Sequence, residues 1–218
     1  MDLQILLQKE KIDNLGYDTL FLERPMSKLI DFKYQDILVA PPKNSDNSVL
    51  KELRLISSKS NNRSQKDIEL IYKIDKNIDE LFIEVLNKYK LSYPETFINL
   101  FYDIVYPVLL NVKGYWNRPR PIQLAKIYGI NIDFIETYST NSASYPSGHV
   151  VYSNLVANII KDIYPQINSK ELDQIVLLTA EGRVLQGAHF PSDNKASLIF
   201  TNFIYQKLYS KLRKYAND

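Results

Sequence analysis

From residue 67 onward, apolar residues recur every three or four positions, which is the period of an α-helix with one buried face. Stripes of this kind run over five stretches: 71–89, 97–109, 151–163, 172–178 and 196–212. No strand pattern of comparable quality occurs. The pattern therefore predicts an all-α, single-domain helical bundle.

Prolines and a capping residue support the predicted helix boundaries. Prolines stand at the first turn of the second helix, after the end of the third and at the start of the fifth: Pro94, Pro165 and Pro191. Pro107 falls inside the second helix and should kink it. Asn168 followed by Glu171 resembles a capping box and predicts the start of the fourth helix.

The first 66 residues show weaker patterns. Leu3, Leu6 and Leu7 suggest a short helix, and Val49 to Ile56 fits one amphipathic helix. The apolar stretch from Tyr17 to Leu22 is ambiguous. The polar run from Ser57 to Gln65 has no period and is interpreted as an exposed loop. We therefore expect an N-terminal extension of short helices and loops (1–66), packed on a helical catalytic core (67–218).

The composition excludes several classes. Net charge is +2, so no bulk charge favours nucleic acid as a partner. The chain contains no cysteine, which excludes disulfides, thiolate metal sites and a cysteine nucleophile. No apolar run reaches the roughly 18 residues of a transmembrane helix. The first residues lack a signal-peptide pattern, so we expect a cytoplasmic protein, or a periplasmic or secreted one if a signal was removed before this numbering.

Three short clusters hold the unusual residues. They span 113–121, 145–149 and 182–193, and together contain both histidines, three of the seven arginines and four of the six glycines. In the middle cluster, Pro146 and Gly148 break the chain just before an apolar stretch. This indicates a helix N-terminus, whose free N–H groups suit an anion such as phosphate. The question is whether the three clusters form one site.

Their chemistry fits phosphoryl transfer. Asp193 lies four residues beyond His189, so its carboxylate can accept the imidazole Nδ1–H and leave Nε2 free as a nucleophile. His149 is then placed to act as a general acid on the leaving oxygen. Positive charge and anion-binding groups would come from Lys113, Arg120, Arg183, the Ser147 hydroxyl and the backbone near Gly148.

The order and spacing of these residues resemble a known family. Lys113-x6-Arg120-Pro121, Pro146-Ser147-Gly148-His149 and Arg183-x5-His189-x3-Asp193 match the three signatures of the phosphatidic acid phosphatase type 2 superfamily. That group includes lipid phosphatases, bacterial class A non-specific acid phosphatases and vanadium haloperoxidases. One signature alone would be weak, whereas three in order are specific.

The resemblance implies an α-helical phosphatase that needs no metal or cofactor. His189 would attack phosphorus and form a phosphohistidine, with His149 as general acid and base and Asp193 orienting His189. The phosphate would be held by Lys113, Arg120, Ser147, Gly148 and Arg183. In character the chain is most similar to the soluble class A acid phosphatases, acting on a small phosphorylated substrate, with vanadate as an inhibitor and homo-oligomers possible.

The chain departs from the family pattern at one position. The third signature usually begins Ser-Arg, whereas here Gly182 precedes Arg183. This loses a hydroxyl beside a phosphate-binding arginine and puts affinity or substrate range in question. Arg118 lies off the signature and is interpreted as a charge at the surface or behind the site. Trp116 and Tyr115 are expected to pack the first cluster, and Tyr145 either packs or walls the site.

Two alternatives remain open. The same pocket could hold vanadate as a cofactor for haloperoxidase chemistry, although the known examples are much larger chains. It could also belong to a non-catalytic phosphate- or phospholipid-binding module, which would need neither His149 nor the pair of His189 and Asp193. A membrane lipid phosphatase is a lesser variant, because no predicted span supports it.

Overall fold

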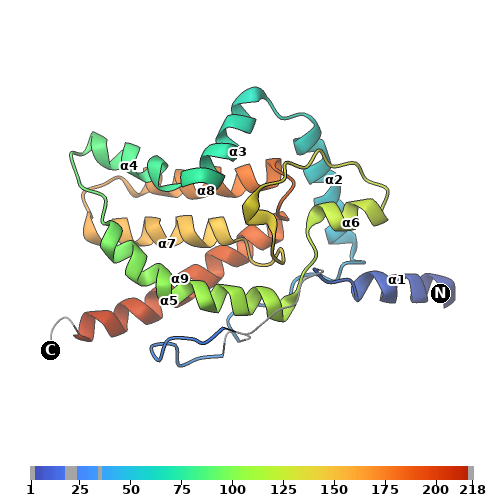
Figure 1. Ribbon diagram of the computed structural model, residues 1–218, viewed down its shortest axis with the longest axis horizontal. Helices are drawn as coiled ribbons and strands as arrows, with labels where there is room; N and C mark the ends of the chain where they lie inside the picture. The colour runs from blue at the N-terminus through green and yellow to red at the C-terminus, as the bar shows by residue number, and fades with distance from the viewer. Residues whose placement is uncertain (1–2, 18–23, 34–35, 216–218) are drawn as a thin grey trace.

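The computed structural model describes residues 3–17, 24–33 and 36–215, and within these ranges its regular elements are all helical. The predicted all-α fold is confirmed. In chain order (Figure 1) the helices are α1 (Leu3–Asp13), α2 (Asn47–Asn61), α3 (Gln65–Asn77), α4 (Asp79–Lys88), α5 (Glu95–Trp116), α6 (Pro121–Ile127), the short 3₁₀ helix η2 (Tyr138–Thr140), α7 (Gly148–Ile163), α8 (Ser169–Leu185) and α9 (Pro191–Tyr215). No helix in the described part of the chain is long and apolar enough to cross a membrane.

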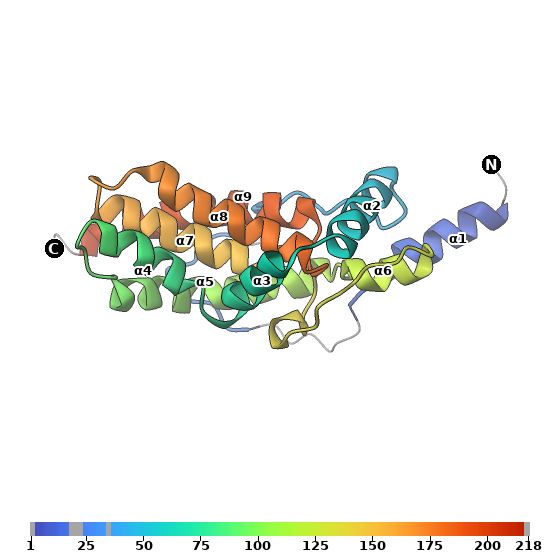
Figure 2. The ribbon, with the colours of Figure 1, turned by 90° about the horizontal axis from the view of Figure 1, so that it is seen from above.

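Helix α7 lies at the centre of the bundle. It packs against α5, α8 and α9, and each of these helices lies next to it in both views (Figures 1 and 2). Most of its surface is buried because apolar residues occupy more than one face: Val150, Val151, Leu155, Val156, Ile159 and Ile160. Burial of such side chains stabilises the fold by about 1.5–3 kcal/mol each. The rigid core therefore fixes the N-terminus of α7, where the middle cluster begins.

A second apolar cluster ties the N-terminal third to the bundle. Val49, Leu53 and Ile56 of α2 pack with Leu124 of α6 and Phe190, which precedes α9. Helix α2 contacts both α6 and α8. In contrast, α1 projects from this end of the molecule (Figure 2).

The predicted loop from Ser57 to Gln65 is wrong. Helix α2 continues to Asn61 and α3 starts at Gln65, so only residues 62–64 connect the two helices. The polar side chains are held by partners distant in sequence: the Ser57 hydroxyl donates to the Asn131 carbonyl, and Arg63 pairs with Asp133 at 2.7 Å. Contacts of this kind cannot be predicted from the spacing of apolar residues along the chain.

The stripe over 71–89 is divided into two helices. The break falls at Ile78, where the Asn77 side chain accepts a hydrogen bond from the Asp79 backbone N–H (3.2 Å) and so competes with the helix. The start of α3 is well defined, because Ser64 and Asp67 form a reciprocal capping box.

The other helix ends agree with the sequence, with one correction. Pro94 occupies the N-cap position just before the first turn of α5, and Pro191 begins α9. Helix α5 continues through Pro107 and changes direction along its length (Figure 1). Asn168 caps α8 by accepting from Lys170 N, but Glu171 does not complete a capping box, since its carboxylate accepts from the Tyr89 hydroxyl at 2.6 Å. Residues 18–22 of the ambiguous stretch lie outside the described residues.

Candidate active site

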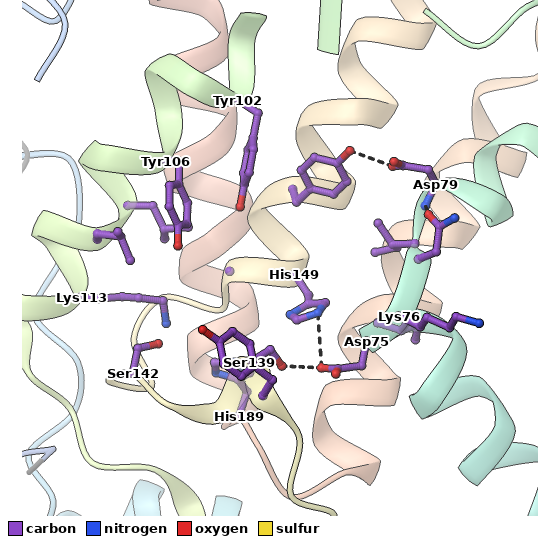
Figure 3. Close-up of a pocket in the computed structure, with 18 of the residues that line it drawn as sticks. Asp75, Lys76, Asp79, Tyr102, Tyr106, Lys113, Ser139, Ser142, His149 and His189 are labelled. Atoms are coloured by element: carbon purple, nitrogen blue, oxygen red, sulfur yellow. Dashed lines mark hydrogen bonds and ion pairs between the residues drawn. The ribbon is translucent and has the colours of Figure 1, made fainter. Parts of the chain in front are cut away.

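The three sequence clusters meet in one pocket of about 540 Å³. Lys113 comes from the last turn of α5, and Arg120 immediately precedes α6. His149 lies in the first turn of α7, and His189 lies in the short connection between α8 and α9. Figure 3 shows Lys113, His149 and His189 around the same cavity. Every residue predicted from the signatures lies in this region of the fold.

His189 and Asp193 form the predicted pair. His189 Nδ1 lies 3.4 Å from Asp193 Oδ2, and both side chains are buried. On the other side of the ring, Nε2 lies 3.3 Å from an Arg120 guanidinium nitrogen. Because the guanidinium can only donate, this contact requires a lone pair on Nε2 and places the proton on Nδ1. The geometry therefore leaves Nε2 unprotonated.

Charge and burial support this protonation state. Burial, with the nearby charges of Arg120 and Lys113, holds the pKa of His189 well below its usual value. The pKa of Asp193 is also lowered, because Arg118, His189 and Ser144 favour its charged form over the cost of burial. The site thus combines a neutral imidazole with an ionised carboxylate.

Three cations, Lys113, Arg120 and Arg183, are held near the pocket by carbonyl and carboxylate oxygens. Lys113 donates to the Ala143 carbonyl (2.6 Å), and Arg120 donates to the carbonyls of Ser142 and Ala188, both at 2.9 Å. Burial lowers the pKa of Arg120 to about 10, and burial again is the main cause of the lowered pKa of Lys113. Positive charges crowded out of water in this way favour a bound anion.

The N-terminus of α7 adds neutral donors. Ser147 occupies the N-cap position of the helix and is fully buried, yet its hydroxyl has no hydrogen-bond partner. Buried hydroxyls are normally satisfied, so this hydroxyl at a helix N-terminus is available to a bound anion. Gly148 follows it and lines the pocket.

His149 faces a carboxylate that the signatures did not reveal. Its Nε2 lies 3.7 Å from Asp75 Oδ1, and its side chain is 20% exposed. Burial and the charge of Arg183 lower the pKa of His149 to about 3, although Asp75 opposes the shift. Without an anion in the pocket, His149 is therefore neutral.

Asp75 also holds Arg183. Its Oδ1 accepts from Arg183 at 3.1 Å and from Thr137 at 2.9 Å. It also accepts from the Ser139 hydroxyl (Figure 3). A signal was present in the sequence, because position 75 falls on the same helical face as Ile71 and Ile78. A carboxylate on an apolar stripe indicates a buried polar partner, which here is Arg183.

Arg118 is buried behind the pair of His189 and Asp193. Its guanidinium lies 2.5 Å from Asp193 Oδ1 and 3.9 Å from the centroid of the Phe190 ring. It also donates to the Ser192 hydroxyl at 2.8 Å. Of the two positions expected for Arg118, the structure shows the one behind the site.

A side chain at position 182 would meet Ile74 of α3. A Cβ atom at this position would lie 2.6 Å from Ile74 Cδ1, which is closer than packed atoms approach. A serine at position 182 would therefore require the Ile74 side chain to shift. The aromatic residues of the first two clusters pack together, with ring centroids of Trp116 and Tyr115 at 4.8 Å and of Trp116 and Tyr145 at 6.4 Å.

Comparison with known proteins identifies the family. The sequence profile of the PAP2 superfamily matches residues 97–214, more than half of the chain. The chain therefore belongs to the PAP2 superfamily.

Two relatives carry more specific names. The chain is 30% identical over 122 residues to a non-specific acid phosphatase of Salmonella typhimurium, and equally to one of Salmonella typhi. Each match covers 52% of this chain and 48% of the relative, so the match spans about half the length of these proteins.

Proposed function

We propose that this protein is a phosphatase that hydrolyses phosphomonoesters without a metal ion, through a phosphohistidine on His189. The observation that carries the proposal is the position of the His189 ring in a pocket lined by cations, where Nε2 faces Arg120 and Nδ1 faces Asp193. The two named relatives support the same reaction class, since both are non-specific acid phosphatases.

In the first step, the phosphoryl group binds among Lys113, Arg120 and Arg183. Nε2 of His189 attacks phosphorus, and the bond between phosphorus and the ester oxygen breaks. His149 donates its proton to that oxygen, so the product leaves as an alcohol. The positive groups stabilise the charge on the equatorial oxygens during transfer.

In the second step, His149 is neutral and accepts a proton from water as the water attacks phosphorus. The bond between phosphorus and Nε2 breaks, inorganic phosphate is released and both histidines return to their starting forms. Asp193 keeps the His189 ring in one tautomer throughout, because its Oδ2 faces Nδ1.

The proton that His149 donates in the first step would be supplied when the anionic substrate binds. His149 is neutral in the empty pocket because its pKa is about 3. A phosphate anion offsets the cations that depress this pKa, so binding should bring a proton to His149. Phosphomonoesters have a second pKa near 6, and the monoanion can carry that proton in. We therefore expect activity to fall as pH rises above about 6.

The proposal is tested with an aryl phosphate and an alkyl phosphate, with and without EDTA. His189→Ala should abolish turnover of both substrates. His149→Ala should lose far more activity on the alkyl ester, because an aryl alcohol leaves without protonation. Full activity of His189→Ala, or loss of wild-type activity with EDTA, would overturn the mechanism. Halide oxidation by the vanadate-loaded protein would instead favour haloperoxidase chemistry.

A further inference from the structure

The pocket continues beyond the phosphate-binding groups into a region with aromatic walls. Tyr102 and Tyr106 line it from α5, Tyr138 from η2 and Tyr152 from α7. The rings of Tyr102 and Tyr152 meet edge to face with centroids 4.8 Å apart, and those of Tyr102 and Tyr106 are 5.3 Å apart. Tyr138 is 93% exposed, so its ring is free to contact a bound molecule.

A carboxylate lies opposite the α5 tyrosines. Figure 3 shows Asp79 across the cavity from Tyr102 and Tyr106, with His149 between the two walls. Asp79 Oδ1 accepts hydrogen bonds from the hydroxyls of Tyr152 (2.8 Å) and Tyr93 (2.6 Å), which fix its position.

The negative charge of Asp79 is not cancelled by its partners. Burial and Asp79 itself raise the pKa of Tyr152 and Tyr93, so both phenols stay protonated and neutral. Among the ion pairs formed by the described residues, none includes Asp79. Lys76 also lines the pocket, but its side chain is exposed and extends away from His149 (Figure 3).

Aromatic rings and a carboxylate in the same half of a pocket favour the binding of a cationic group. Ring faces carry negative electrostatic potential and bind ammonium cations, and aromatic cages of this type recognise quaternary ammonium ligands. A neutral aromatic group could stack on the same rings but would gain nothing from Asp79. An ammonium cation would interact favourably with both the rings and the Asp79 carboxylate.

We infer that the tyrosine-lined half of the pocket binds a cationic leaving group, so that the preferred substrates are phosphate monoesters of amino alcohols. The inference rests on the proposed phosphatase function and adds the substrate class. Hydrolysis then breaks the bond between phosphorus and the alcohol oxygen, consumes one water and releases the amino alcohol and inorganic phosphate. The phosphate occupies the cationic end of the pocket and the ammonium group the end with Asp79.

The test compares two substrates that differ only in charge. Phosphocholine is one, and the other is its neutral isostere, in which a tert-butyl group replaces the trimethylammonium group. We expect wild-type kcat/KM to favour phosphocholine by about tenfold, the size of a partly desolvated cation–π contact joined to one carboxylate. Binding of both compounds to the His189→Ala protein, measured by calorimetry, should show the same ratio without any turnover.

Matched variants assign the preference to particular groups. Asp79→Asn keeps the shape and should bring the ratio toward one by weakening only phosphocholine. Tyr106→Leu should do the same, whereas Tyr106→Phe keeps the ring face and should retain the preference. Asp103→Asn is the control, because Asp103 is an exposed carboxylate on α5 that does not line the pocket.

Each outcome decides the inference. A wild-type ratio near one in both kinetics and calorimetry would overturn it, and so would a ratio that Asp79→Asn and Tyr106→Leu leave unchanged. Turnover of an aryl phosphate without any preference for phosphocholine would refute the substrate class and leave the phosphatase function standing. Absence of turnover on every ester would refute the phosphatase function itself, while the calorimetric ratio would still decide whether the cage binds the cation.

Discussion

Arg118 allows a sharp test of how the site is supported. Arg118→Met removes the charge 2.5 Å from Asp193 Oδ1 and leaves a carboxylate with no exposed surface. Removing one partner of a buried ion pair costs about 3–5 kcal/mol, because the remaining charge stays uncompensated. Typical domains are stable by about 5–15 kcal/mol, so this is a large share of the total. Activity should fall as well, since Arg118 is the main group that favours the ionised carboxylate facing His189 Nδ1.

The measurement is a double-mutant cycle by urea unfolding at neutral pH. Asp193→Asn added to Arg118→Met removes the stranded charge, so the double variant should be more stable than Arg118→Met alone. Arg54→Met is the control: Arg54 is exposed on α2, and its loss should change the free energy of unfolding by no more than about 0.5 kcal/mol. Additive effects, or a cost below about 1 kcal/mol for Arg118→Met, would refute the reasoning.

Three further predictions concern the neighbouring residues. Gly182→Ser should cost about 1–3 kcal/mol of unfolding free energy by overpacking, and Ile74→Val should recover much of it by removing the clashing Cδ1; an equal cost in both backgrounds would contradict the steric account. Because His149 titrates near 6.5 when unfolded but at about 3 when folded, and the pKa of His189 is lowered too, the unfolded state binds more protons between these pH values. The free energy of unfolding should therefore fall on acidification by up to about 1.4 kcal/mol per pH unit for each histidine, and urea unfolding of a His149→Gln protein should show a smaller slope than wild type between pH ~6.5 and ~4. Asp75→Asn should bind inorganic phosphate more tightly by calorimetry, since it removes the carboxylate that competes for the arginine; weaker binding would instead show that Asp75 positions this arginine for phosphate.

The helical core was predictable because its information is local. Stripes of apolar residues and the prolines at 94 and 191 mark where α5 and α9 begin. The same reasoning failed from Ser57 to Gln65, where polar side chains form a helix and its connection through contacts with residues about 70 positions away. The local pattern of apolar and polar residues does not predict such contacts.

The residues of the site also divide into those that the local sequence predicts and those whose roles depend on distant contacts. Its signature residues could be chosen from the sequence because reactive groups cluster around glycine and proline breaks. The role of Asp75 could be predicted only in part: its place on an apolar stripe indicated a buried polar partner, and the structure identifies that partner as Arg183, 3.1 Å away. Gly182 is a similar case: the sequence showed a missing hydroxyl, and the structure adds that a side chain at this position would displace Ile74 Cδ1.

The central claim is that phosphorus becomes bonded to Nε2 of His189. The most direct measurement is rapid mixing with an aryl phosphate, whose alcohol leaves without protonation by His149, followed by quenching under alkaline conditions that preserve phosphohistidine and mass spectrometry of the peptides. The account predicts a phosphoryl group on the peptide that contains His189, more of it in His149→Ala because its hydrolysis lacks a base, and none in His189→Ala. A phosphoryl group on the His149 peptide, or turnover by wild type with no phosphorylated peptide at any time, would contradict it.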